Sequence, residues 1–183
     1  MIYVFLANGF EETEAICPID IMLRAGIEVE LISVSDDLTV KGTHGIDIKA
    51  DKTINDISLP CDTLELIMLP GGMPGTTNLY DCEALREAVT LAANKGIAIA
   101  AICAAPSILG KMGLLKGKTA TCFEGYEFTL EGGNVTGGRV ETDGNIITGK
   151  AVGTAIEFGI EIIRYFRGDG EADAIKCAMV CKE

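Results

Sequence analysis

The sequence has few basic residues and only one histidine. Lys plus Arg total 15 against 27 Asp plus Glu, which gives a formal net charge of −12. A charge of this sign and size repels nucleic acid and anionic membranes, so we expect no strong nucleic-acid binding and consider small molecules or proteins as partners. A structural zinc site needs four ligands, and His44 alone is present to supplement the thiols. We therefore predict no metal.

Long hydrophobic runs are also missing. Gly, Pro or charge interrupts every apolar stretch before it reaches the roughly 18 residues of a spanning helix. Residues 1–7 lack the basic flank and the cleavage site of a secretory signal. The 7 cysteines are an odd number and lie within expected strands and helices, unlike those of a secreted disulfide scaffold. We expect a cytoplasmic protein with reduced thiols and no membrane partner.

Short runs rich in β-branched residues alternate with helical segments. A chain of 183 residues with 48% hydrophobic content fits one domain over residues 1–183. Strands that are apolar throughout are typical of a parallel sheet buried on both faces. We therefore predict an α/β fold with a mostly parallel sheet and helices on both faces. The expected strands are residues 2–7, 28–34, 64–69, 97–102 and 145–149.

Further elements are predicted between and after these strands. A helix over residues 11–24 should be disturbed by Pro18 and end at Gly26. The alternating segment 38–51 predicts an antiparallel hairpin appended to the sheet, and segment 139–148 predicts a second strand pair. The last predicted helix, residues 152–167, carries isoleucines that should face the sheet, namely Ile156, Ile160 and Ile163.

One cysteine lies at a strand-to-helix turn. Cys103 closes the fourth strand, and Ala101 and Ala105 provide the small neighbours that a nucleophile elbow requires. A helix that begins beside the sulfur favours thiolate over thiol. We predict that Cys103 is a nucleophile and a reactive anion near neutral pH. The alternative, that it is one more buried small apolar residue, stays open from the residues alone.

Two loops are expected to support Cys103. The third strand runs into Gly71-Gly72, and the backbone N–H groups of Gly71, Gly72 and Ala104 are candidates for holding an oxyanion. A tight turn that needs positive φ is the alternative role for the glycines. On the first helix, Glu14 is the acid expected to face the crevice, where a protonated carboxyl can donate to sulfur. A solvated, acidic helix start is the alternative.

These segments together resemble a known family. LANGFEETEA at 6–15, LPGG at 69–72 and AAICAAP at 100–106 make the whole chain similar to the ThiJ/PfpI superfamily, also written DJ-one/PfpI. The most similar branch is that of the parkinsonism-associated protein deglycase. The resemblance implies a flavodoxin-like three-layer sandwich related to class I glutamine amidotransferases. It also implies a homodimer with the first helix near the interface.

The resemblance also implies an activity. It assigns the nucleophile to Cys103, its carboxyl partner to Glu14 and the oxyanion donors to Gly72 and Ala104. The implied reactions act on small carbonyl substrates without a cofactor, either converting methylglyoxal to lactate as a glyoxalase III does or removing glycation adducts as a deglycase does. A redox-sensing, chaperone-like protein that uses Cys103 as a switch is the alternative.

The chain departs from the family pattern at two positions. Protease-like relatives carry His directly after the cysteine, and here that residue is Ala104, so a cysteine peptidase is disfavoured. A later position that is often His in the similar branch is Cys122, a candidate resolving thiol for Cys103. We interpret His44, in the expected hairpin, as a structural or interface residue.

Overall fold

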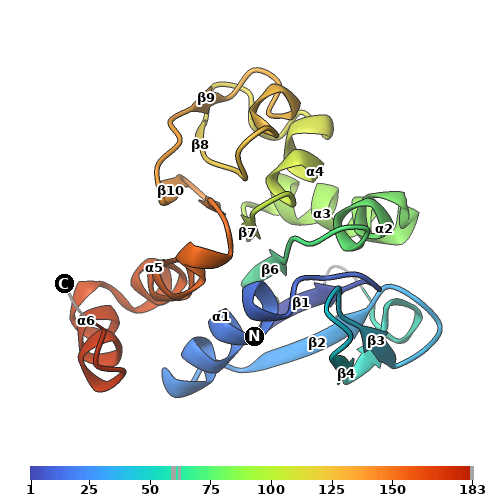
Figure 1. Cartoon of the computed structure of the whole chain (residues 1–183), viewed down its shortest axis with the longest axis horizontal. Helices are drawn as coiled ribbons and strands as arrows, with labels where there is room; N and C mark the ends of the chain where they lie inside the picture. The colour runs from blue at the N-terminus through green and yellow to red at the C-terminus, as the bar shows by residue number, and fades with distance from the viewer. Residues whose placement is uncertain (59–60, 62, 182–183) are drawn as a thin grey trace.

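A seven-stranded sheet forms the centre of the protein (Figure 1). The computed structural model describes residues 1–58, 61 and 63–181. The strand order is β10-β11-β7-β6-β1-β2-β5, and every neighbouring pair is parallel except β10 with β11. The strands are β1 Ile2–Leu6, β2 Val29–Ser33, β5 Lys52–Thr53, β6 Leu66–Leu69, β7 Ala98–Ile102, β10 Val140–Asp143 and β11 Ile146–Gly149.

Helices cover both faces of this sheet, as predicted. Side chains alternate along β1, so Phe5 joins an apolar cluster with α3 and α4 while Val4 joins a second cluster with α1 and α5. Burial on both faces explains why the strands are apolar throughout. The helices are α1 Glu12–Arg24, α2 Gly75–Asp81, α3 Glu83–Lys95, α4 Pro106–Lys111, α5 Ala155–Arg167 and α6 Asp169–Ala178.

Two small strand pairs lie outside the main sheet. The predicted hairpin is present as β3 Thr39–Lys41 and β4 Asp47–Lys49, which are antiparallel. It is appended as a two-stranded sheet of its own and is not hydrogen-bonded into the main sheet. The other pair, β8 Thr119–Ala120 and β9 Asn134–Val135, was not predicted because two-residue strands carry no readable alternation.

The predicted last helix begins three residues late and faces the core differently. A 3-10 turn precedes α5, in which Ile160 and Ile163 are buried as expected but Ile156 is 43% exposed. Gly159 lies against α1, where a Cβ would stand 3.1 Å from the Cα of Pro18. The close packing of α1 on α5, rather than the isoleucine spacing alone, therefore sets which face of α5 is buried.

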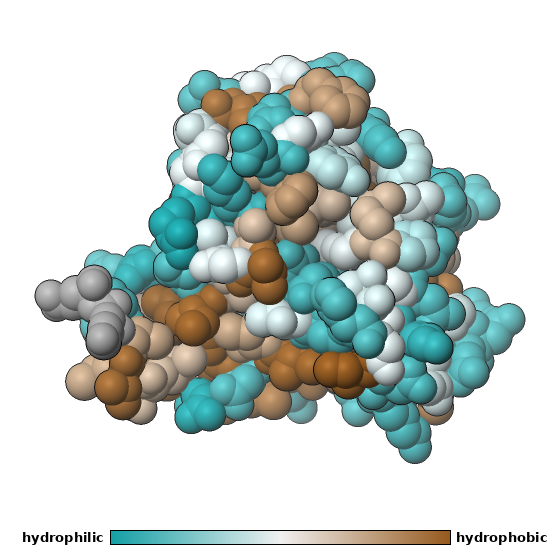
Figure 2. Space-filling view, viewed as in Figure 1, coloured by the Kyte–Doolittle hydropathy of each residue, from teal (hydrophilic) through white to brown (hydrophobic). Residues whose placement is uncertain are grey.

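Apolar side chains also remain at the surface. Figure 2 shows brown residues gathered along the lower part of the molecule, over the helices α1, α5 and α6. The exposed apolar residues of these helices are Ile16, Leu23, Ile156 and Tyr165. Within the described part of the chain, no helix combines the length and the apolar character needed to cross a membrane.

Candidate active site

Cys103 occupies a strained turn directly after β7. Its φ of 66° lies in the left-handed region, which residues other than glycine rarely adopt. Two backbone hydrogen bonds hold it there: the N–H of Cys103 donates to the Gly149 carbonyl at 2.9 Å, and the N–H of Phe123 donates to the Cys103 carbonyl at 2.8 Å. α4 begins three residues later, at Pro106. The turn is the predicted nucleophile elbow, and retained strain of this kind is typical of functional positions.

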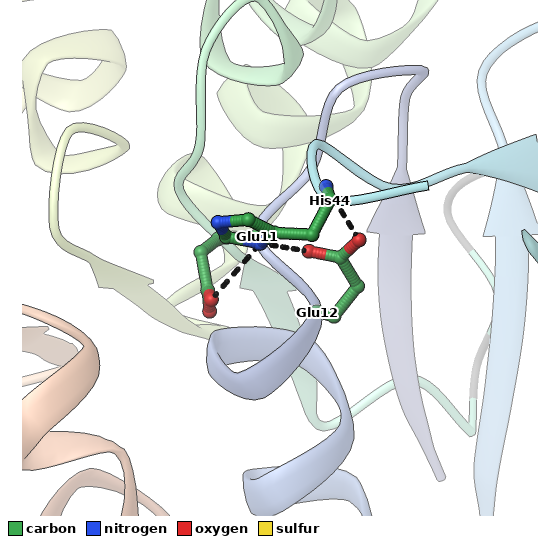
Figure 3. Close-up of side chains that lie close together, drawn as sticks. All are labelled: Glu11, Glu12 and His44. Atoms are coloured by element: carbon green, nitrogen blue, oxygen red, sulfur yellow. Dashed lines mark hydrogen bonds and ion pairs between the residues drawn. The ribbon is translucent and has the colours of Figure 1, made fainter. Parts of the chain in front are cut away.

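The first turn of α1 carries an anchor that the sequence did not reveal. Glu12, one of the acids at this acidic helix start, is only 5% exposed. Its carboxylate accepts from the backbone N–H of His44 at 2.7 Å and of Ile46 at 3.3 Å, and it contacts His44 Nδ1 at 2.8 Å (Figure 3). Three donors thus surround one carboxylate, which is the pattern of a structural anchor.

The anchor joins two distant segments. Thirty-two residues separate Glu12 from His44, and no local pattern could connect them. Glu11 also lies near the imidazole, with Oε1 3.9 Å from Nδ1, so these three side chains form one acid-histidine group. The hydrogen bond to Glu12 raises the pKa of His44. His44 is therefore held at the start of α1 in a structural role, which agrees with its interpretation from the sequence.

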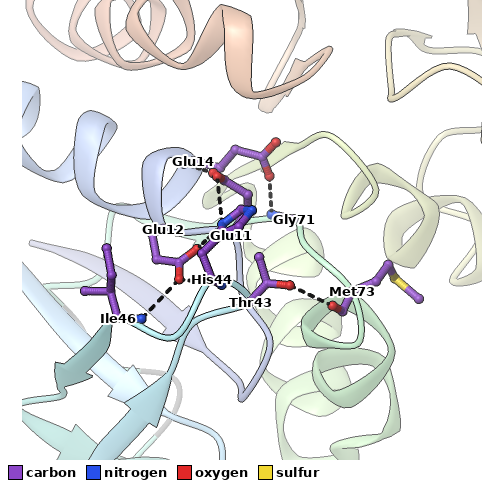
Figure 4. A network of polar contacts seen from close by, with 8 residues as sticks. All are labelled: Glu11, Glu12, Glu14, Thr43, His44, Ile46, Gly71 and Met73. Atoms are coloured by element: carbon purple, nitrogen blue, oxygen red, sulfur yellow. Dashed lines mark hydrogen bonds and ion pairs between the residues drawn. The ribbon is translucent and has the colours of Figure 1, made fainter.

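Glu14 is buried beside Cys103. The residue is 1% exposed, and its Oε2 accepts from the Gly71 N–H at 3.1 Å (Figure 4). The Glu14 carboxyl also lies close enough to the Cys103 thiol for each group to affect the pKa of the other. The structure thus brings together the two side chains on which the sequence-based hypothesis depends.

Glycine at position 71 makes this meeting sterically feasible. A Cβ there would stand 2.5 Å from Glu14 Oε2, 2.7 Å from Cys103 Cβ and 2.9 Å from the Ile102 carbonyl oxygen. Gly72 has a φ of 91°, and its Cβ would lie 2.4 Å from the Glu11 nitrogen. Gly71 is needed for close approach, and Gly72 for both close approach and positive φ.

Backbone donors surround the sulfur. Burial raises the pKa of Cys103, and the N–H groups of Ala104 and Gly72 act against that effect. Their predicted oxyanion role stays a prediction. The N–H of Gly71 donates to Glu14 instead. This hydrogen bond does not favour the predicted oxyanion role of Gly71, which stays a prediction.

The carboxyl and the thiol titrate as a pair. Burial, with the charge of Glu11, raises the pKa of Glu14 to about 7 despite hydrogen bonds that favour its ionised form. Burial, and then the charge of an ionised Glu14, raises the pKa of Cys103. That charge is absent whenever Glu14 is protonated, so ionisation of the sulfur depends on which partner holds the shared proton. The expected thiolate stays a prediction.

The backbone next to Cys122 lies beside Cys103, because the N–H of Phe123 donates to the Cys103 carbonyl at 2.8 Å. The side chain of Cys122, however, packs in a different cluster. It belongs to the apolar cluster of α3 and α4, while Cys103 packs against the cluster of α1 and α5. Burial, and then the charge of Glu127, raises the pKa of Cys122 to about 11, which makes its thiolate scarce. The resolving-thiol role stays a prediction, and this placement does not favour it.

The comparisons with known proteins agree with this geometry. The model of the DJ-1/PfpI family matches residues 1–165. The chain belongs to the DJ-1/PfpI family. The Parkinson disease protein 7 homolog of Danio rerio is 32% identical over 183 residues, which is 98% of this chain and 96% of that protein. The resemblance seen in the sequence is thereby confirmed.

Other DJ-1 relatives differ in length or have solved structures. Protein DJ-1 homolog B of Arabidopsis thaliana is 36% identical over 97% of this chain, but the chain spans only 40% of that protein. Oxidised DJ-1 from Toxoplasma gondii is 33% identical with a TM-score of 0.93, covering 98% of this chain and 97% of that one. A cysteine-to-alanine mutant of a DJ-1 superfamily protein from Salmonella typhimurium is 30% identical with a TM-score of 0.94, covering 100% and 98%. The flavodoxin-like fold is confirmed.

Proposed function

We propose that this DJ-1/PfpI protein is a cysteine-dependent, cofactor-free enzyme that acts on small reactive carbonyls. The observation that carries the proposal is the closeness of the buried Glu14 carboxyl to Cys103 at a strained elbow. The pairing provides a nucleophile, a proton carrier and two backbone donors around one point. Conversion of methylglyoxal to lactate uses all three.

The proposed reaction is an internal redox exchange followed by hydrolysis. The thiolate of Cys103 adds to the aldehyde carbon of methylglyoxal, and the aldehyde oxygen takes the proton of Glu14. Glu14 then removes the hydrogen on that carbon, and return of the proton to the neighbouring carbon gives a lactoyl thioester. Water cleaves the thioester, which releases lactate and restores the thiol. The N–H groups of Gly72 and Ala104 hold the oxyanion.

Turnover by native protein and by Cys103→Ser tests the proposal. We expect loss of methylglyoxal and gain of lactate with the native protein and a fall of at least about a hundredfold in the variant, because the hydroxyl is a far weaker nucleophile. The exposed Cys177 serves as control, and Cys177→Ser should keep the native rate. Equal rates for native protein and Cys103→Ser, or no turnover by either, would contradict the proposal.

A redox switch is the second candidate. One specific observation favours it: the solved relative from Toxoplasma gondii is an oxidised DJ-1, and Cys103 is itself only partly buried. A thiolate in such a position is readily oxidised. Intact mass and peptide mapping after mild peroxide should then show two added oxygens on Cys103. An unreactive Cys103 would count against both candidates.

We also propose that the chain forms a homodimer through α1. Leu23 is 55% exposed on this helix, and Ile16 lies exposed two turns earlier. Sedimentation velocity should find a dimer for the native protein and a monomer for Leu23→Asp, because a buried unpaired charge opposes association. Phe128, which is 82% exposed outside α1, provides the control Phe128→Asp. A native monomer, or a Leu23→Asp dimer as stable as the native one, would overturn this proposal.

A further inference from the structure

Glu11, Glu14 and Gly71 form a closed ring of hydrogen bonds. The N–H of Glu11 donates to the Gly71 carbonyl at 2.9 Å, and the N–H of Gly71 donates to Glu14 Oε2 at 3.1 Å. The N–H of Glu14 completes the ring by donating to Glu11 Oε2 at 2.6 Å. Figure 4 shows the two acids at the start of α1, where Glu11 is the N-cap residue, next to Gly71. The carboxylate of Glu11 thus supports the backbone from which Glu14 reaches Cys103.

The donors alone do not decide where the shared proton lies. Backbone N–H groups favour the charged form of both partners: those of Gly71 and Val152 act to lower the pKa of Glu14, and those of Ala104 and Gly72 act to lower the pKa of Cys103. Ordinary acidity favours an ionised carboxyl and a neutral thiol. An asymmetry that opposes this preference must therefore come from elsewhere.

Burial and charge supply that asymmetry. Burial raises the pKa of both groups, and Glu14, which is 1% exposed, is more deeply buried than Cys103, which is only partly buried. The negative charge of Glu11 also raises the pKa of Glu14. Both effects favour the proton on Glu14 and the charge on sulfur.

We propose that Glu11 is a positioning residue for the reactive pair, whose carboxylate fixes Glu14 against Gly71 and keeps the shared proton on the Glu14 carboxyl. The inference rests on the pair being the reactive centre proposed above. The ionisable groups next to Glu11 are Glu12 on α1 and His44 from the β3–β4 turn. Glu12 is already occupied by His44 and by the Ile46 N–H.

Alkylation of Cys103 as a function of pH tests the role of Glu11. Glu11→Gln keeps an oxygen that accepts the Glu14 N–H but removes the charge. Modification of Cys103 by iodoacetamide is followed by peptide mass spectrometry. We expect it to be about three- to tenfold slower at neutral pH in this variant, as a shift of up to one unit in the pKa of Glu14 implies. The difference in alkylation rate between the native protein and Glu11→Gln should disappear at high pH, where Glu14 and Cys103 are ionised in both proteins.

Two matched variants complete the experiment. Glu83→Gln removes an exposed acidic residue from the first turn of α3 and should leave the alkylation profile unchanged. His44→Asn, introduced into the native protein and into Glu11→Gln, removes the imidazole near Glu11. The slower alkylation caused by Glu11→Gln should persist when His44→Asn is present. A Glu11→Gln profile within twofold of native, or a rate difference that persists at high pH, overturns the inference. Alkylation needs no carbonyl turnover. A failure of the proposed reaction can therefore be told apart from a failure of the role inferred for Glu11.

Discussion

Position 71 decides whether a carboxyl and a thiol from two distant segments can meet. The sequence predicted a glycine turn after the third strand, and it placed Cys103 and Glu14 near the same sheet edge. It did not predict that Gly71 stands between their side chains, because close approach depends on the packing of α1 against the elbow and not on the local pattern. Burial of Glu12 escaped prediction for the same reason.

Replacement of Gly71 by alanine tests the close approach. Alanine would place its Cβ 2.5 Å from Glu14 Oε2 and 2.9 Å from the Ile102 carbonyl oxygen, so the loop or the carboxyl must move. We expect Gly71→Ala to lower the free energy of unfolding by about 1–3 kcal/mol and to slow alkylation of Cys103. Gly170, in α6, has open space around it, and Gly170→Ala should cost nothing in denaturant titration. Native stability and reactivity in Gly71→Ala would refute the steric account.

At the scale of elements, the β3–β4 hairpin and the start of α1 act as one unit. The sequence predicted both elements, but their connection lies in contacts across the fold. Glu12 holds the hairpin turn through His44, and Thr43 Oγ1 donates to the Met73 carbonyl at 3.1 Å. The hairpin therefore braces both α1 and the loop that follows Gly72, two of the segments that form the site.

The brace should weaken on both sides of a pH window. The hydrogen bond to Glu12 raises the pKa of His44, so the stability that it contributes is lost as pH rises through that pKa. Burial opposes ionisation of Glu12, but hydrogen bonds from His44 and from backbone N–H groups lower its pKa, so its contribution is lost as pH falls through that value. We expect amide exchange in residues 39–49, corrected for intrinsic rates, to be slowest in the weakly acidic range between the two.

His44→Asn provides the comparison for this hairpin. In the variant, amide exchange of residues 39–49 should no longer speed up on the alkaline side of the window. Protection of α3, on the other face of the sheet, should stay as in the native protein. An unchanged pH dependence of hairpin exchange in His44→Asn would show that another group braces this segment.

At the scale of the whole molecule, the sheet and its two covering layers followed from the apolar strands and from the three motifs. α6 and the β8–β9 pair were missed. In α6 only Ala172 is buried, so the helix shows little of the apolar periodicity on which prediction depends. Where a segment owes its structure to one neighbour, as α6 does to α5, the sequence offers a weak signal.

The free energy of unfolding should depend on pH because Glu14 is buried. Burial raises the pKa of Glu14 from 4.5 to about 7, so the folded state holds a proton that the unfolded chain releases in this range. Stability is then full below 4.5 and falls as pH rises, by about 3 kcal/mol across the range. Urea unfolding of the native protein and of Glu14→Gln, whose side chain stays neutral, gives two free energies of unfolding at each pH. Their difference isolates the contribution of the Glu14 carboxyl. A difference that does not grow with pH would contradict the burial of an ionisable group here.

The most direct measurement of the central claim is the ultraviolet thiolate absorbance of the native protein minus that of Cys103→Ser, followed through a pH titration. If Glu14 keeps the shared proton, the Cys103 thiolate signal should rise near neutral pH, well below the ordinary thiol value of 9.0. A signal that appears only above 9.0 would show that the proton stays on sulfur, and the assignment of Cys103 as the nucleophile would then be contradicted.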